Sequence, residues 1–81
     1  MLDVKKDGLR IIIDVRENIK KGEHPRNEII DYVKEVEKGS MIEIHLPHPA
    51  PPLTALLEGL GLECVTNELA PGHFRLLTLK I

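Results

Sequence analysis

Two stretches of the chain alternate between hydrophobic and polar residues, which is the pattern of a half-buried β-strand. The first runs from Leu9 to Val15 and the second from Met41 to Leu46. The positions that these strands would turn toward the core are Leu9, Ile11, Ile13, Val15, Ile42, Ile44 and Leu46. Residues 62–68 and 74–81 predict two further strands, and the Ala-Pro-Gly step at 70–72 predicts the tight connection between them.

Between the strands, hydrophobic residues recur every three or four positions, which predicts two amphipathic helices. The first begins at Pro25, where the missing N–H costs nothing, and continues to Lys38 before a cap at Gly39. Its core positions are Ile29, Ile30, Val33 and Val36. The second follows a proline-rich loop at 47–52 and is ended by glycine. Its core positions are Leu53, Leu56, Leu57 and Leu60.

The order of these elements is βαβαββ, and we expect residues 1–81 to form one domain. Strands that alternate with helices predict a two-layer α/β (α+β) sandwich, because right-handed crossovers put both helices on the same side of the sheet. We therefore expect a four-stranded mixed sheet with two helices on one face and a bare opposite face.

The bare face would expose a continuous hydrophobic strip to water. Because such a strip is unfavourable in water, we expect a homodimer that buries it. Its residues would be Ile12, Met41, Glu43, His45, Phe74, Leu76 and Thr78. A competing register of the last strand turns Phe74 and Leu76 toward the helices and leaves Leu77, Leu79 and Ile81 outside. The expectation of a partner holds in both registers, and His45 is then a surface residue or part of the contact.

Charge and cysteine content limit the partners and the compartment. The 81 residues include 11 basic and 13 acidic side chains, interspersed, so the chain lacks the basic stripe that nucleic acid requires. Its one cysteine, Cys64, cannot form an internal disulfide. No stretch approaches the ~20 apolar residues of a membrane span, and the first ten residues are too charged for a secretory signal. We expect a cytoplasmic protein that binds neither nucleic acid nor membranes.

Two histidine-proline steps, His24-Pro25 and His48-Pro49, stand at the starts of the two predicted helices. Backbone N–H groups are unpaired at a helix start and the helix dipole is positive there, so such positions often receive an anion or a reacting group. The prolines on both sides of His48 also restrict its backbone. That rigidity is equally consistent with a binding site and with a stiff loop whose only role is to lead into the helix.

Four short motifs in order carry a resemblance over nearly the whole chain. They are Asp14-Val15-Arg16, Glu23-His24, the run from Pro47 to Leu53, and the run from Ala70 to Arg75. They resemble the D-V-R, R-H, D-H-D-P-x-P-L and G-P-x-x-W-R motifs of uncharacterised relatives of the small TusA/SirA-like proteins. An arginine, two aspartates and the tryptophan of those motifs are replaced here. The resemblance implies a SirA-like fold in which the first three strands run parallel and the fourth returns between the second and third.

The sulfur carriers of this family begin the first helix with C-P-x-P, where a thiolate at the helix start can hold a persulfide. The chain has His24-Pro25-Arg26-Asn27 at that place, and an imidazole cannot carry sulfane sulfur as a persulfide. Cys64 lies within a strand pattern, where a small buried side chain is the ordinary occupant. We therefore do not expect a persulfide carrier.

In the implied fold, His24, His48 and His73 would converge on one rim of the sheet, joined by Asp14 and Arg16. The candidate ligand-binding residues are Asp14, Arg16, His24, His48 and Arg75. Arg75 would bind an anion with Arg16, or else be a cross-strand surface charge. The leading hypothesis is a non-enzymatic module that recognises a protein partner or a small anionic ligand, since no serine, thiol or paired carboxylate stands beside a base.

Other interpretations of the histidines stay open. His24, His48 and His73 would hold Zn²⁺ or Fe²⁺ in a metal-binding or redox-linked module, although their spacing matches no compact ligand motif. Catalysis with His24 as general base is a third class. A purely structural His24 would cap its helix or bond to Asp14.

Overall fold

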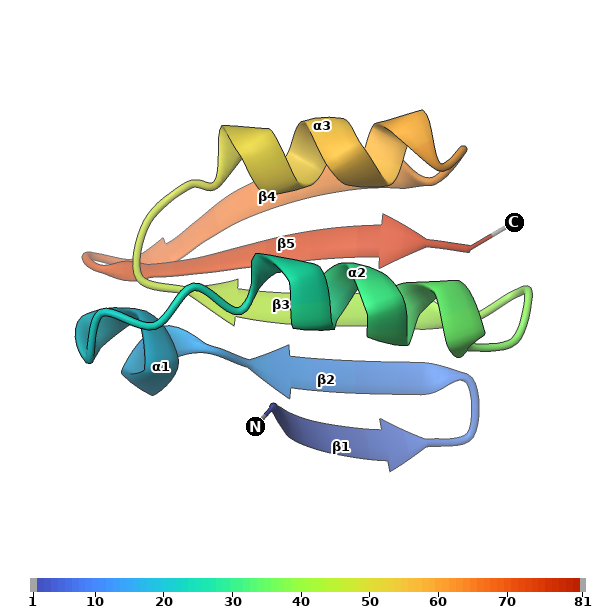
Figure 1. Cartoon of the computed structure of the whole chain (residues 1–81), viewed down its shortest axis with the longest axis horizontal. Coiled ribbons are helices and arrows are strands. Elements are labelled where there is room, and N and C mark those ends of the chain that lie inside the picture. The colour runs from blue at the N-terminus through green and yellow to red at the C-terminus, as the bar shows by residue number, and fades with distance from the viewer. Residues whose placement is uncertain (1, 81) are drawn as a thin grey trace.

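The structure of the protein, a computed structural model, describes residues 2–80 (Figure 1). Its elements are β1 (Asp3–Asp7), β2 (Arg10–Asp14), α1 (Arg16–Lys20), α2 (Arg26–Glu35), β3 (Met41–Leu46), α3 (Pro51–Gly59), β4 (Glu63–Ala70) and β5 (His73–Leu79). The strands form one sheet in the order β1-β2-β3-β5-β4. β2 and β3 run parallel, whereas the β1–β2, β3–β5 and β4–β5 pairs are antiparallel.

The expected mixed α/β architecture is confirmed, but the expected count of four strands and two helices is wrong for residues 2–80. The four predicted strands have the relative order β2-β3-β5-β4, and β1 is added at the β2 edge. Every residue of β1 except Val4 is an exposed charge, so hydrophobic alternation cannot mark this strand. The added helix α1 has no buried residue and gives no hydrophobic stripe.

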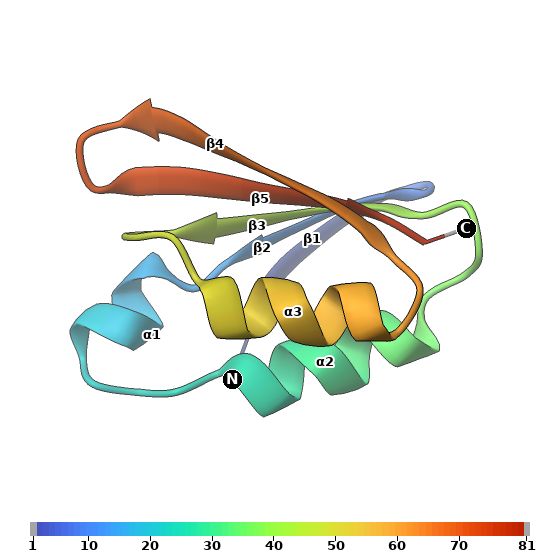
Figure 2. The same ribbon diagram turned by 90° about the horizontal axis from the view of Figure 1, so that it is seen from above.

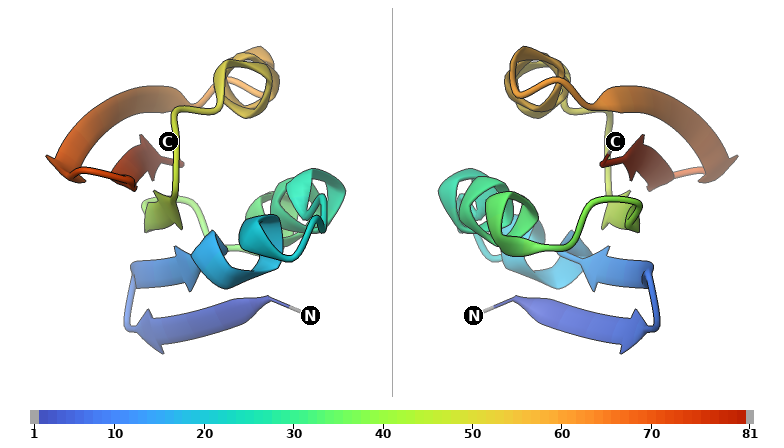
Figure 3. Two further views of the ribbon diagram at one scale, coloured as in Figure 1. Left: turned by 90° about the vertical axis from the view of Figure 1, so that its left-hand side faces the viewer. Right: turned by 90° about the vertical axis from the view of Figure 1, so that its right-hand side faces the viewer.

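The helices lie on one face of the sheet, as the view from above and the two end views show (Figures 2 and 3). Isoleucine and valine at alternate strand positions meet the inner sides of α2 and α3 and close a single core. Its buried members are Ile11, Ile13, Val15, Ile29, Val33, Ile42, Ile44, Leu46, Leu53, Leu57, Leu62 and Leu76. Among the helices within residues 2–80, none is both long and apolar enough to cross a bilayer.

The competing register of the last strand is the correct one. Ile44 pairs with Leu76 and Ile42 with Thr78, and Leu76 and Thr78 are both buried on the helix side. Leu77 and Leu79 therefore lie on the opposite face, while Ile81 lies outside the described residues. Consecutive leucines in β5 fit either register, so only pairing with β3 decides between them.

Two boundaries also differ from expectation. Leu9 belongs to the turn before β2 and is 48% exposed, so it is not a core residue. The helix α2 ends at Glu35, because Val36 already has an extended backbone. The carbonyl groups at this helix end accept hydrogen bonds from the Lys80 ammonium rather than continuing the helix to Lys38.

Candidate functional site

A groove of about 460 Å³ opens between the loop that enters α2 and the loop that enters α3. His24 lines it from the first loop and His48 from the second, so the structure brings these two predicted residues to one hollow. Both side chains are exposed. Ile29, Leu46 and Leu53 are buried residues that reach the groove from the core. We call this hollow the helix-start groove.

Local chain geometry fixes one of the two imidazoles in the helix-start groove. Nδ1 of His48 donates to the carbonyl oxygen of Pro49 at 2.9 Å, so this nitrogen carries a proton and its hydrogen bond is made within the loop. Within the described residues, His24 has no hydrogen-bonding partner, and the expected bond to Asp14 is absent. The carboxylate of Asp14 instead bonds Arg16.

The two helix starts in the helix-start groove differ in what they offer an anion. Neither N-cap residue, Pro25 or Ala50, supplies a side-chain hydrogen bond. The first turn of α3 begins with Pro51 and Pro52, which have no N–H to donate. Of these two helix starts, α2 therefore has the larger number of backbone N–H groups that could donate to an anion.

A second pocket, of about 180 Å³, lies on the opposite face of the sheet. It is lined by Asp3, Lys5, Ile12, Asp14, Arg16, His45 and His73. His24, His48, His73, Asp14 and Arg16 all lie at the end of the sheet where β2 and β3 finish, as predicted, but they line two separate pockets rather than one. The side chains of Asp14 and His73 project from strands away from the helices, whereas His24 and His48 belong to loops that enter the helical layer.

We define the open face as the side of the sheet away from α2 and α3, which carries Arg10, Ile12, Asp14, Met41, Glu43, His45, His73, Arg75, Leu77 and Leu79. Here Arg16 holds Asp14 through bonds of 3.0 Å from Nε to Oδ1 and 2.8 Å from Nη2 to Oδ2. The Arg16 backbone N–H adds a third bond at 3.1 Å. These contacts hold the pKa of the Asp14 carboxyl below its usual value.

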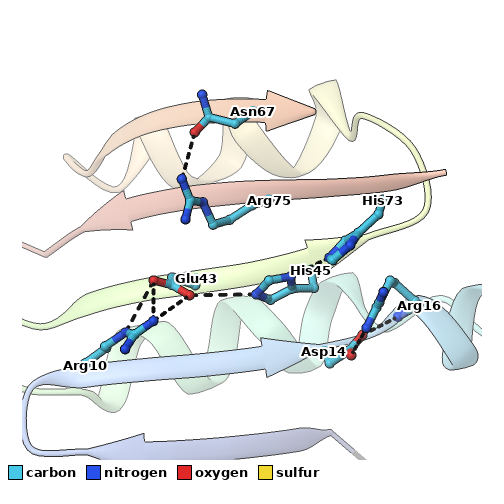
Figure 4. A network of polar contacts seen from close by, with 8 residues as sticks. All are labelled: Arg10, Asp14, Arg16, Glu43, His45, Asn67, His73 and Arg75. Atoms are coloured by element: carbon cyan, nitrogen blue, oxygen red, sulfur yellow. Dashed lines mark hydrogen bonds and ion pairs between the residues drawn. The ribbon is translucent and has the colours of Figure 1, made fainter. Parts of the chain in front are cut away.

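A chain of polar contacts crosses three strands of the open face (Figure 4). Arg10 donates from Nε and Nη2 to Glu43 Oε1 at 3.3 and 3.2 Å, and Glu43 Oε2 lies 3.7 Å from His45 Nε2. His45 Nδ1 lies 2.8 Å from His73 Nε2. Partial burial lowers the pKa of His73, and the nearby Arg16 and His45 lower it further.

Sequence reasoning placed Glu43 and His45 on the surface and missed this chain of contacts. Glu43 is only 7% exposed although it faces away from the helices. The 28 positions that separate His45 from His73 carry no local signal of their contact, since it depends on how β5 pairs with β3. Strand alternation alone could place both histidines on one face only after the register of β5 was known.

The remaining candidate, Arg75, bonds across β4 and β5. Its Nη2 donates to Asn67 Oδ1 at 3.4 Å, and its Nε is buried without a partner among the described residues. Arg16 bonds Asp14 instead, so the two arginines form no joint contact with each other or with a shared carboxylate among residues 2–80. This agrees with the interpretation of Arg75 as a cross-strand charge.

The predicted metal ligands are not gathered in one place. His73 bonds His45 on the open face, whereas His24 and His48 line the helix-start groove. Within residues 2–80, no group of three or more His, Cys, Asp or Glu side chains is placed to hold a metal ion. His24, His48 and His73 therefore do not converge on one Zn²⁺ or Fe²⁺ ion, because His73 lies on the opposite face from the other two.

The fold and its two pockets define an α/β sandwich with candidate binding surfaces on both layers. Searches against protein-family models, curated proteins and solved structures found no match to this chain. The function must therefore be inferred from the chemistry of the two pockets.

Proposed function

We propose that the protein is a cytoplasmic, non-enzymatic binding module of the TusA/SirA-like type, and that its helix-start groove takes a small anionic group, free or displayed by a protein partner. The observation that carries this proposal is the shared groove, which joins His24 and His48 from loops 24 residues apart in sequence. The order β2-β3-β5-β4 supports the family assignment, because it is the strand order that the resemblance implies.

The shape and chemistry of the helix-start groove favour a small organic anion. A volume of about 460 Å³ lies in the range of small-molecule sites. Buried Leu46 and Leu53 offer an apolar surface, while Arg26 and the two imidazoles offer positive or hydrogen-bonding groups. A carboxylate or phosphate monoester on a short apolar body would satisfy both parts of this lining.

A persulfide function has little support in the groove. His24 occupies the place of the family thiol, and Cys64 lies on β4, away from the groove lining. The Cys64 thiol donates toward Thr78 Oγ1 at 3.4 Å, and the side chain packs against the core. A half-buried thiol in this setting behaves as a small hydrophobic group rather than as an exposed nucleophile.

Amide-resolved NMR titration tests the groove. Inorganic phosphate, phenyl phosphate and benzoate are added separately to the full chain, and saturable shifts are expected at Arg26, Asn27 and Leu53. A His24→Gln/His48→Gln double variant should bind at least about tenfold more weakly, whereas His73→Gln serves as a matched control on the other face. The proposal fails if none of the three probes gives saturable groove shifts, or if the double variant binds as tightly as the parent.

The open face also offers an interface, for which we propose a second copy of the chain as partner. Met41, Val65 and Leu79 are 42%, 57% and 37% exposed, and the strand pairing places them beside Leu77 in one patch. Such a contiguous apolar patch is typical of an interface. Analytical ultracentrifugation should show a dimer, and Val65→Lys should dissociate it. Leu60→Lys, at the exposed end of α3, is the control and should leave the dimer intact. A parent chain that is monomeric at all concentrations would contradict this interface.

A further inference from the structure

The contact between His45 and His73 has an unusual chemical consequence. Nδ1 of His45 and Nε2 of His73 lie 2.8 Å apart, with the two rings tilted by 43° and their centroids 5.0 Å apart. Two ring nitrogens at this distance share one proton, because a contact between two N–H groups would bring donor against donor. One of the two nitrogens therefore presents a lone pair at the contact. An ion that binds both nitrogens at about 2.0 to 2.1 Å must lie beside the line that joins them, since its midpoint is too close to each nitrogen.

We propose that His45 Nδ1 and His73 Nε2 form a binding site for a divalent transition-metal ion of the copper or zinc class. Imidazole nitrogens suit these ions. Bonds of about 2.0 to 2.1 Å put two ligands about 3.4 Å apart in the tetrahedron of Zn²⁺, and about 3 Å apart at the right-angled positions that Cu²⁺ prefers. The observed spacing of 2.8 Å is close to the latter value. The ion replaces the shared proton, which passes through solvent to the other nitrogen of the ring that donated it, so both imidazoles stay neutral and no electron is transferred.

The groups behind His45 match the outer support of a metal ligand. Glu43 Oε2 lies 3.7 Å from Nε2 of His45, on the side of the ring away from His73. Arg10 in turn donates to the Glu43 carboxylate, which is 7% exposed and so has little freedom to move. At 3.7 Å this contact is too long for a hydrogen bond, so the carboxylate acts through its negative charge, which stabilises a cation held by the ring.

The remaining coordination positions of the ion open into the pocket of about 180 Å³. Asp14 pairs with His45 in the strand register, but its carboxylate is held by Arg16. Protein donors therefore number two among the described residues, and water fills the other positions. Lys5 and Arg16 line the same pocket, so their charges weaken the hold on a cation and favour an anion as an added ligand. The site is an exchangeable one rather than a structural metal centre.

Titration of the tag-free chain with Cu²⁺ and, separately, Zn²⁺ tests this site. Calorimetry should give one ion per chain, and electron paramagnetic resonance of the Cu²⁺ form should show coupling to two imidazole nitrogens. We expect His73→Gln, which removes a direct ligand, to weaken binding at least about tenfold, and Glu43→Gln, which removes only a nearby charge, to weaken it by less. The His24→Gln/His48→Gln variant should bind as the parent does, which separates this site from the helix-start groove.

A measurement on the unmodified chain guards against variants that misfold. Cu²⁺ at a small fraction of the protein concentration should broaden the imidazole NMR signals of His45 and His73 before those of His24 and His48. Equal broadening of all four histidines, binding unaffected by His73→Gln, or no binding of either ion would overturn the proposal. These outcomes leave the anion titration of the groove unaffected, since the two sites lie on opposite faces.

Discussion

Replacing Lys80 with methionine should destabilise the protein by removing the support of α2 at its C-terminal end. The Lys80 ammonium donates to the carbonyl oxygens of Val33, Lys34 and Val36 at 3.0, 2.8 and 2.7 Å. These carbonyls belong to the last turn of α2 and the residue that follows it, where the helix has no further N–H groups to offer. One side chain after β5 thereby satisfies three acceptors on the helical layer.

The size of the effect follows from burial. A hydrogen bond to a charged group contributes roughly 1.5–3 kcal/mol, and a cation at a helix C-terminus adds about 0.3–1 kcal/mol. The bond to Lys34 is exposed, so water replaces it at small cost, whereas those to Val33 and Val36 are half-buried. We therefore expect Lys80→Met to lower the free energy of unfolding by about 2 kcal/mol, which lowers Tm by on the order of 10 °C.

Urea and thermal unfolding followed by circular dichroism measure this loss. Lys38→Met is the matched control, because Lys38 is exposed near the same helix end and makes no ion pair or hydrogen bond with a described residue. Its effect should stay within about 0.5 kcal/mol. Equal stability of the two variants would refute the reasoning. A changed dependence of the free energy of unfolding on urea concentration would show instead that the substitution alters the compactness of the unfolded or the native state.

Three further predictions concern ionisation and backbone conformation. Partial burial and Arg16 lower the pKa of His73, so the unfolded histidine takes up its proton first as pH falls below about 6.5, and the free energy of unfolding decreases. In urea titrations between about pH 7 and 5, His73→Gln should make this decrease smaller. An unchanged dependence of stability on pH in the variant would count against this prediction. Arg16 also lowers the pKa of Asp14, so a second loss is expected below about pH 4, absent in Asp14→Asn; the same acid midpoint in both chains would contradict this. Gly39→Ala should destabilise the protein by about 1 kcal/mol, because the backbone at this position has a φ of +90°. Gly59→Ala in α3 should stabilise it by up to about 0.5 kcal/mol, because alanine has less backbone freedom to lose on folding. Thermal melts that shift in the same direction for both variants would contradict this prediction.

Periodicity predicted the buried strand positions well, but in α3 it was right only for Leu53 and Leu57: the predicted core residues Leu56 and Leu60 are 46% and 44% exposed. The alternate residues Ile11, Ile13, Ile42 and Ile44 are all fully buried, as their spacing requires. Periodicity could not predict the strand β1, because β1 is an edge strand whose side chains are mostly exposed and which is held by backbone pairing to β2. Such pairing leaves no hydrophobic period in the sequence.

The sequence could predict the candidate sites only where a proline marks a helix start beside their residues. Proline marks the starts of α2 and α3, so the sequence alone could place His24 and His48 near helix starts. The contact of His45 with His73 depends instead on a register that two neighbouring leucines, Leu76 and Leu77, leave undecided. Long-range side-chain contacts of this kind are the part of a site that local patterns do not encode.

The division of the four histidines between two faces also determines how the proposed functions interact. A second copy bound over the open face would approach the His45–His73 pair from the side of Leu77 and Leu79, whereas the helix-start groove would stay open to solvent. Metal binding and dimerisation are therefore expected to influence each other, and by linkage the influence must be reciprocal. Anion binding in the groove is separated from both by the core, in which the inward strand residues are fully packed. Cu²⁺ should consequently change the monomer–dimer equilibrium while leaving the affinity for phosphate unchanged.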